Sequence, residues 1–260
     1  MIIAVDTRFL VKNKSNRYSN FIYEVFKRIT HLHKEHTFIF ISDHTLDAAF
    51  IFSDNVLTVI KGPRVKRSAQ LLIWYNIKIP AILKKYKADA FVSFDFCSLI
   101  TKLPQCLILN DLSFLYYPSE GNVFFYKKFI PRSLEKSKAV VTVSEFSKKD
   151  ILKHYKIDAE KVNVVYNGVD ENFSAIGIEE KESIKEKYAD GNEYFIYTGE
   201  IHEKNNLLNL LKAFSAFKKR QKSSMQLLIV TNAGLKYEEL MKTLRLFRFK
   251  EEVKVLTGLS

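Results

Sequence analysis

The chain has 260 residues, 47% of them hydrophobic, and a formal net charge of +12. This hydrophobic content excludes a disordered polymer and predicts one or two globular domains. Most of the positive charge lies before Ser174. Such an excess is typical of a lysine-rich solvated surface, or of a surface that meets nucleic acid, anionic lipid or phosphorylated sugars.

Short apolar runs alternate with longer amphipathic segments from the N-terminus onward. This alternation of strands and helices predicts a parallel sheet with helices on both faces. The helical segments lie at residues 21–32, at 72–82, where we expect a kink at Pro80, and at 151–155. The expected buried strands cover residues 2–5, 37–41, 56–60, 90–93, 106–109, 140–143 and 162–166.

Two local signals mark the end of this first unit. Ser144 is a candidate N-cap for the last of its helices, and Ser147 is a second candidate. The Asn167-Gly168 pair predicts a sharp turn after the last strand. We therefore expect the sheet to end close to this turn.

A second α/β unit follows a linker near residues 173–178 and a polar helix at 179–188. The sequence predicts two Rossmann-like domains, residues 1–173 and 174–260. Such a domain normally has five or six strands. We therefore expect the second to be incomplete, its remainder supplied by further sequence or by a partner. Its expected strands cover residues 194–198, 227–230 and 253–256, and its helices residues 207–222 and 236–249.

The two cysteines and the N-terminus bear on the cellular compartment. Cys97 and Cys106 lack the spacing of a metal site, and we interpret them as small buried side chains in a reducing cytoplasm. Residues 1–6 begin as a strand rather than as a secretion signal. No run reaches the roughly 18 apolar residues that span a bilayer. We expect a cytoplasmic protein, at most peripheral at the inner face of the membrane.

Ligands of open α/β sheets bind at the carboxyl ends of the strands, which selects the loops to inspect. The loop after the first strand, residues 8–20, carries Lys12, Lys14 and Arg17 but no glycine to cradle a phosphate. Either its cationic side chains bind an anion, or it is a solvated loop.

Two more loops of the first unit place carboxylates after strands. Asp111, preceded by Asn110, either accepts a proton or orients a hydroxyl, or it caps the following segment. Asp95 lies between two phenylalanines, an arrangement that suits a sugar face and its hydroxyls. The alternative is that these aromatic rings pack in the core.

In the second unit the loop 199–206 is the main candidate. Gly199 ends a strand, and Lys204 and Asn205 precede a helix whose N-terminus and lysine would jointly hold a diphosphate. The alternative is a surface lysine beside a capping asparagine. His202 is either a proton carrier or a polar surface residue.

Residues 122–138 are rich in aromatic and basic side chains. This mixture suits contact with a lipid-linked acceptor at a membrane surface. An ordinary helix with a wide apolar face has the same composition.

Three motifs are more specific than any of these loops. They are TVSEFSK at residues 142–148, VVYNGVD at 164–170, and YTG followed by NLL and LKAF within 197–214. Over essentially the whole chain the sequence resembles family-4 glycosyltransferases. Those are retaining enzymes of the GT-B fold that use nucleotide-diphosphate sugars without a bound metal. The resemblance implies a donor held by the C-terminal domain, an acceptor held by the N-terminal domain, and transfer in the cleft between the domains.

The sequence also departs from the family pattern. Arg17 and Ser19 stand where the glycines of the first loop are expected, and Asn110 replaces the histidine of a His-Asp-Leu motif. Aligned on the following asparagine, the lysine that contacts the diphosphate becomes Asn205, and Glu200 replaces an arginine found in some members. The paired-glutamate motif of the donor sugar would lie beyond residue 260.

The resemblance implies a hexosyltransferase-type enzyme that uses a nucleotide-diphosphate sugar and no cofactor or metal. Its acceptor would be a polysaccharide or a lipid-linked glycan. Loss of one contact to the leaving diphosphate costs about 2.7–4 kcal/mol. We therefore hypothesise that this chain is weak or inactive; the alternative is a non-catalytic relative that binds a sugar or a partner.

A nucleic-acid partner is not expected because no recognition motif accompanies the charge. The candidate residues are Asn110 and Asp111 for catalysis, Arg17, Ser19 and Asp95 for the substrate, and Gly199, Glu200, His202, Lys204 and Asn205 for the donor.

Overall fold

The computed structural model describes residues 1–11, 17–117, 123–169, 172–232 and 235–258. It divides into two units, Met1–Gly168 and Val169–Ser260. The sequence-based boundary lies a few residues later, after Phe173. Within the described ranges, every helix is too short or too polar to cross a membrane.

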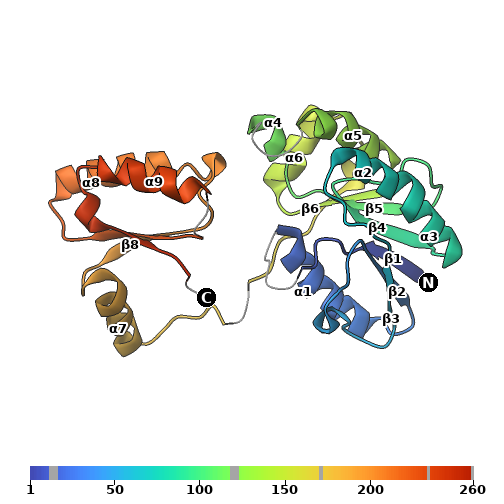
Figure 1. The fold of residues 1–260 in the computed structure, drawn as a ribbon, viewed down its shortest axis with the longest axis horizontal. Coiled ribbons are helices and arrows are strands. Elements are labelled where there is room, and N and C mark those ends of the chain that lie inside the picture. Colours follow the sequence, from blue (N-terminus) through green and yellow to red (C-terminus); the bar gives the residue numbers. More distant parts are fainter. Residues whose placement is uncertain (12–16, 118–122, 170–171, 233–234, 259–260) are drawn as a thin grey trace. The chain divides into compact units, whose positions relative to one another are not determined.

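The first unit is built on a seven-stranded sheet in which all neighbouring strands are parallel (Figure 1). The strand order is β3-β2-β1-β4-β5-β6-β7. The order reverses direction between β1 and β4, the switch point at which open sheets bind ligands. The strands are β1 Ile2–Asp6, β2 Thr37–Ser42, β3 Val56–Ile60, β4 Ala90–Phe94, β5 Gln105–Ile108, β6 Ala139–Thr142 and β7 Val162–Val164.

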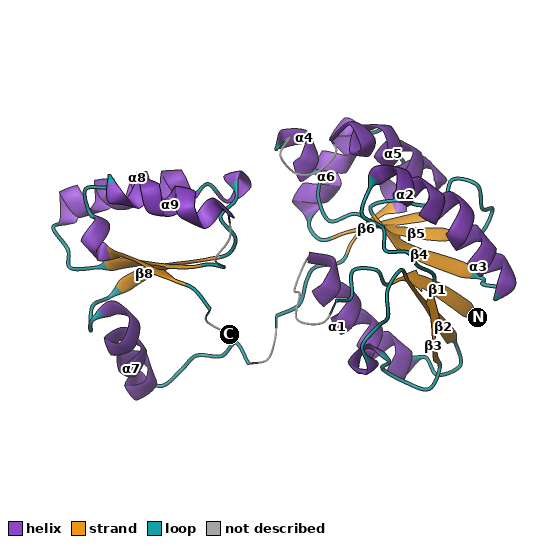
Figure 2. Cartoon of the chain, viewed as in Figure 1, coloured by secondary structure: helices purple, strands orange, loops and turns teal. Residues whose placement is uncertain are grey.

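Helices cover both faces of this sheet, as the sequence predicts (Figures 1 and 2). On one face, α1 packs through a buried cluster that includes Ile22 and Phe26, and on the other, helices contribute Ile82, Ile130 and Ile151 to a second cluster. The helices are α1 Arg17–Leu32, α2 Ser68–Ile73, α3 Ile79–Lys85, α4 Ser113–Tyr116, α5 Val123–Lys136 and α6 Glu145–His154.

The disturbance expected at Pro80 begins one turn before the proline. A π-helical turn, Trp74–Lys78, separates α2 from α3, and the Ile79 N–H donates to the Trp74 carbonyl five residues earlier. Pro80, in the first turn of α3, has no N–H to continue the preceding α-helical ladder. This turn places Trp74 and Tyr75, both buried, under the sheet edge where β1 ends.

Other local predictions have mixed outcomes. Ser144 is the N-cap of α6, its Oγ accepting from the Ser147 N–H at 3.1 Å, so Ser147 is not the cap. The last strand ends at Val164 rather than at residue 166, because its partner β6 ends at Thr142 and Tyr166 is exposed.

The second unit contains a three-stranded parallel sheet in the order β10-β9-β8. Figure 2 shows α7 on one face and α8 and α9 on the other. Leu211, Phe214, Leu227 and Leu240 form the buried core under α8 and α9. The elements are α7 Ile178–Ala189, β8 Tyr194–Thr198, α8 Leu207–Gln221, β9 Gln226–Val230, α9 Leu235–Arg245 and β10 Val253–Leu256.

Replacement of Phe91 tests the packing of the larger sheet. Phe91 is fully buried in β4, and Phe91→Ala is expected to lower the free energy of unfolding by about 3–5 kcal/mol. The control is Phe146→Ala, because Phe146 is 75% exposed and its loss is expected to change stability by less than about 0.5 kcal/mol. Urea unfolding followed by circular dichroism measures both. Equal effects of the two substitutions would contradict this packing.

Candidate functional site

The carboxyl end of β1 holds a buried ion pair. The Arg8 guanidinium contacts the Asp6 carboxylate at 2.9 Å, and Asp6 is fully buried. The Tyr75 hydroxyl donates to Asp6 Oδ2 at 2.8 Å and accepts from Arg8 Nη2 at 2.8 Å. The three groups satisfy one another's hydrogen-bonding capacity, so they hold the carboxyl end of β1 in one geometry.

The environment fixes the protonation of these groups. Burial works to lower the pKa of Arg8, but the Asp6 carboxylate outweighs it and raises that pKa above its ordinary value. Burial, followed by the Asp6 charge, raises the pKa of Tyr75 well above its ordinary value. Arg8 therefore stays charged and Tyr75 stays a hydrogen-bond donor.

Asp95 follows β4 at the same edge, with a left-handed backbone (φ 60°) that a non-glycine residue rarely adopts. It is 5% exposed, and the Tyr18 hydroxyl of α1 donates to its Oδ1. The flanking Phe94 and Phe96 are buried, so these two rings pack in the core. Asp95 itself is held in a strained, defined position beside the switch point.

Asn110 and Asp111 follow β5, the neighbour of β4 in the sheet. The Asn110 side chain is 6% exposed, and among the described residues no hydrogen-bond partner reaches its Oδ1. A buried amide oxygen without a partner is uncommon and marks a place where a ligand or water is expected. Asp111 Oδ1 accepts from the Ser113 N–H at 2.9 Å, so this carboxylate does cap the next segment.

The other substrate candidates of the first unit lie at the start of α1. Ser19 is 7% exposed within this helix. Arg17 is the first residue of α1, but its side chain lies outside the described part of the chain, as do Lys12 and Lys14.

Sequence reasoning placed Arg8 and Tyr18 in the loop 8–20 without giving either a role, and it missed Tyr75. The sequence feature that could have indicated this network is Asp6, a charged residue at the end of an otherwise apolar strand. The contact between Asp6 and Tyr75 joins residues 69 apart in sequence, so no local pattern predicts it.

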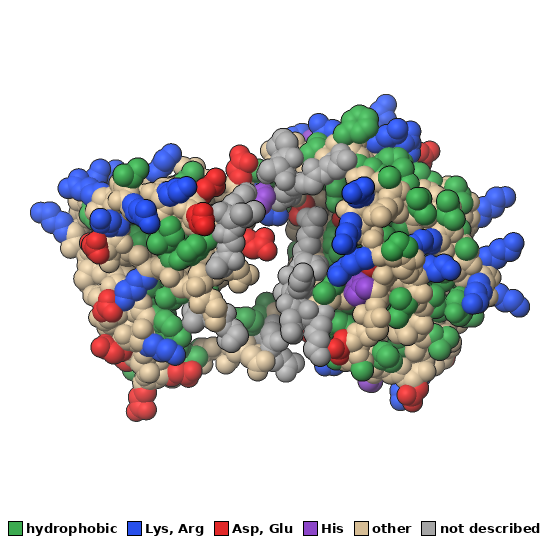
Figure 3. Space-filling model, viewed as in Figure 1, with side chains coloured by type: hydrophobic (Ala, Val, Ile, Leu, Met, Phe, Trp, Pro, Cys, Tyr) green, Lys and Arg blue, Asp and Glu red, His purple; other side chains and the backbone are tan. Residues whose placement is uncertain are grey.

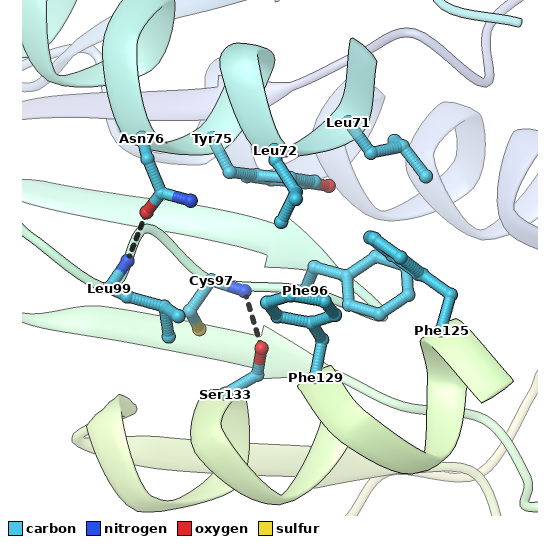
Figure 4. A pocket seen from close by; sticks show the side chains of 10 residues that line it. All are labelled: Leu71, Leu72, Tyr75, Asn76, Phe96, Cys97, Leu99, Phe125, Phe129 and Ser133. Atoms are coloured by element: carbon cyan, nitrogen blue, oxygen red, sulfur yellow. Dashed lines mark hydrogen bonds between the residues drawn. The ribbon is translucent and has the colours of Figure 1, made fainter. Parts of the chain in front are cut away.

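An apolar crevice adjoins this edge and is drawn in Figure 4. Cys97 donates its backbone N–H to Ser133 Oγ at 3.0 Å, and Leu99 donates its own to Asn76 Oδ1 at 2.9 Å. Its free volume is about 10 Å³, which admits at most one water molecule. It is a packed seam between the 71–76 segment and α5 rather than a substrate pocket. Burial raises the pKa of the Cys97 thiol to about 12, which agrees with the structural role expected for it.

In the second unit, the loop after β8 is folded around one carbonyl. The Glu200 carbonyl accepts from the Tyr197 hydroxyl at 2.7 Å and from the Asn205 side-chain amide at 2.8 Å. His202 Nδ1 accepts from the Lys204 N–H at 3.3 Å. The five predicted donor residues thus belong to one connected loop, in which Asn205 has a holding role.

A hollow of about 480 Å³ borders this loop, a volume within the range of small-molecule sites. Of the predicted donor residues, His202 lines it and the other four do not. Three other residues of the loop also line it, and the remainder of its wall comes from α8 and α9. Its lining residues are Ile201, His202, Glu203, Asn206, Leu207, Leu208, Glu239, Leu240, Lys242 and Thr243.

Basic side chains are scattered rather than gathered on the face drawn in Figure 3. Lysines and arginines occur over both units and alternate with hydrophobic side chains. On this face the charge has the distribution of a solvated surface.

Residues 19–173 match the description Glycosyltransferase Family 4. The O-antigen chain mannosyltransferase RfbU of Salmonella typhimurium is 29% identical over 160 residues, covering 60% of this chain and 40% of that protein. A glycosyltransferase from Rickettsia africae has a TM-score of 0.65 at 20% identity, covering 100% of this chain and 68% of its own. Anabaena HepE in complex with UDP-glucose has a TM-score of 0.64 at 13% identity, covering 100% and 69%. At these identities the two structures are evidence for the fold.

Gly199 gives a test of the loop after β8. Its φ of 142° is a conformation that side chains with a Cβ rarely adopt, so Gly199→Ala is expected to destabilise the protein by about 1–3 kcal/mol. Gly168→Ala is the control, because no atom lies within 4 Å of a Cβ built there. Urea unfolding should separate the two variants, and an unaffected Gly199→Ala protein would contradict the observed loop.

Proposed function

This chain belongs to glycosyltransferase family 4, and from that premise we propose that it transfers a sugar from a nucleotide-diphosphate sugar to a glycan acceptor. Its two parallel-sheet units have the GT-B type of fold that the sequence predicts. The observation that carries the proposal is the buried Oδ1 of Asn110, which no hydrogen-bond partner reaches in the described parts of the chain and which directly precedes Asp111 within the segment that matches the family.

The roles follow from the positions in the first unit. Asp111 accepts a proton from, or orients, the acceptor hydroxyl. Asn110 offers its Oδ1 to a hydroxyl of the substrate, which would satisfy that buried atom. Asp95 binds sugar hydroxyls near the switch point, and Ser19 extends the substrate contact along α1. A substrate-binding role for Arg17 remains a prediction from the sequence. Asp6, Arg8 and Tyr75 position this edge without contacting substrate.

The donor is assigned to the second unit. The 480 Å³ hollow suits a nucleoside, and Lys204 with the first N–H groups of α8 would stabilise the leaving diphosphate. Gly199, Glu200 and His202 shape this loop. Because cationic and N–H donors meet the developing charge, no cofactor or metal is part of the proposal.

The finer assignments are a hexosyl donor, retention of anomeric configuration, and a polysaccharide or lipid-linked acceptor. For the hexosyl donor and the glycan acceptor, support comes from RfbU, an O-antigen chain mannosyltransferase, and from HepE, crystallised with UDP-glucose. Retention is what the family resemblance implies. The match to RfbU spans 40% of that protein, so these assignments are part of the proposal.

We also propose that turnover is slow. The Asn205 amide donates to the Glu200 carbonyl. The chain therefore has a hydrogen bond within the loop where the family pattern has a lysine that contacts the diphosphate. Loss of one such contact slows transfer about a hundred- to a thousand-fold. The second candidate is a non-catalytic sugar-binding relative, which the same substitution favours.

Asp111→Asn distinguishes catalysis from capping. Asparagine keeps an oxygen for the Ser113 N–H but removes the charge, so we expect transfer to fall at least about 100-fold with stability unchanged. The control is Asp54→Asn, an exposed carboxylate in the loop before β3. The assay incubates the protein with a panel of nucleotide sugars and glycan acceptors and measures released nucleoside diphosphate.

The outcomes separate the two candidates. Transfer by the wild type that Asp111→Asn abolishes supports the enzyme. Nucleotide-sugar binding without transfer supports the non-catalytic relative. Absence of both binding and transfer would contradict the proposal.

The lipid-linked acceptor leads us to propose a peripheral contact at the inner face of the membrane. Phe124 and Phe146, in the first turns of α5 and α6, are 77% and 75% exposed. Exposed lysines 127, 128 and 149 lie on the same two helices. Aromatic rings that insert beside lysines that attract anionic headgroups are the components of interfacial binding.

A vesicle assay tests this membrane contact. The double substitution F124A/F146A is expected to weaken binding to phosphatidylglycerol vesicles at least about tenfold, because each buried phenylalanine contributes about 1.5–3 kcal/mol. Leu246→Ala is the control, since Leu246 is 91% exposed but lies on the second unit. Cosedimentation at low and high salt gives the affinity, and equal binding by all three proteins would exclude this surface.

A further inference from the structure

A cluster of potential metal ligands lies in the turn between α1 and β2, at the opposite edge of the sheet from Asp95 and Asn110. His33, Glu35 and His36 each offer one ligand atom, and these atoms all lie within 4.8 Å of one another. His33 Nδ1 is 3.1 Å and His36 Nδ1 is 3.7 Å from Glu35 Oε1. Two imidazoles and a carboxylate thus lie close enough for one ion to replace the hydrogen bond that His33 and Glu35, both exposed, form with each other.

The turn that carries this cluster is held by Asn55. Its side-chain amide donates to the carbonyls of Thr30, His33 and His36 at 3.1, 3.1 and 2.9 Å. Ser53 Oγ donates to Asn55 Oδ1 at 2.7 Å and so fixes the orientation of the amide. The backbone is therefore ordered independently of any ion, which lowers the entropy cost of ligand binding.

The histidine rings are also arranged by contact. His33 and His36 stack with ring centroids 5.7 Å apart and an interplanar angle of 19°. His36 Nδ1 is buried, and among the described residues no hydrogen-bond partner reaches it. Buried polar atoms usually have a hydrogen-bond partner or a ligand, so this ring nitrogen near a carboxylate is available to bind an ion.

We propose that His33, Glu35 and His36 bind a divalent transition metal ion of the Zn²⁺ class. Zinc bonds of about 2.0–2.2 Å to nitrogen and oxygen in a tetrahedron place neighbouring ligand atoms roughly 3.3 Å apart. The two distances to Glu35 lie on either side of that value. Water would complete the fourth position.

Imidazole favours zinc, copper and nickel over magnesium and calcium, which prefer oxygen ligands. The ion would join the end of α1 to the start of β2, far along the sheet from the transfer site. This site does not rest on the proposed transferase function, and its role is structural rather than catalytic.

Titration of the full chain with ZnCl₂ by isothermal calorimetry tests the site. We expect one ion per chain, an affinity reduced at least tenfold by His36→Ala and by Glu35→Gln, and a thermal midpoint that zinc raises in the wild type but not in these two variants. MgCl₂ should give no heat at the same concentrations.

His31→Ala is the matched control. His31 lies two residues away, but its Nδ1 contacts the Lys27 carbonyl at 2.7 Å and it is not part of the cluster. Its loss should leave zinc binding unchanged. The proposal is overturned if the wild type binds no zinc, or if His31→Ala weakens binding as much as His36→Ala does. Circular dichroism without metal verifies that each variant is folded.

Discussion

The ion pair between Asp6 and Arg8 is the constraint on which the candidate site of the first unit depends. A fully buried carboxylate is costly unless it is paired and hydrogen-bonded. Arg8 supplies the charge and Tyr75 supplies a second donor. Because the Tyr75 hydroxyl also lies 3.1 Å from the Phe94 carbonyl, the same network fixes the chain just before Asp95. The ends of β1 and β4 are thereby held together at the switch point.

The loop after β8 is held differently, because its side chains donate hydrogen bonds to a backbone carbonyl rather than to a charged side chain. Tyr197 and Asn205 both donate to the Glu200 carbonyl. A lysine at position 205 would have one ammonium group to share between this carbonyl and a phosphate. Asparagine stabilises the loop through its hydrogen bond to the carbonyl, but it offers no positive charge to a bound phosphate. The sequence departure and the local structure therefore have one physical explanation.

Elements with strong periodicity were predictable from sequence. The apolar runs of β1, β2 and β3 and the cap at Ser144 are found where the patterns predict them. Boundaries that depend on a partner were not, as the early end of β7 shows. The π-helical turn at Trp74 also escaped prediction, because the proline signal marks a break without fixing how the preceding turn adjusts.

The candidate site divides in the same way. Asp95, Asn110 and Asp111 were found because residues that follow strands are placed by topology alone. The contacts of Tyr18 and Tyr75 were missed because they join distant segments. The pair of Asp6 and Arg8 is local, but two opposite charges two residues apart do not by themselves predict a buried ion pair. The role of Asn205 was missed because a carbonyl partner leaves no trace in sequence. The sequence therefore predicted that the candidate residues lie at the carboxyl ends of the strands. It did not predict the hydrogen-bond network that holds these strand ends together.

Trp74 is the one tryptophan of the chain, and it is fully buried in the first unit with the Arg8 guanidinium 5.1 Å from its ring. Its fluorescence emission is therefore an intrinsic optical reporter of that unit. The second unit has tyrosine and phenylalanine as its chromophores. Excitation of tryptophan at the red edge of its absorption therefore reports the unfolding of the first unit alone, because the second unit contributes no tryptophan emission.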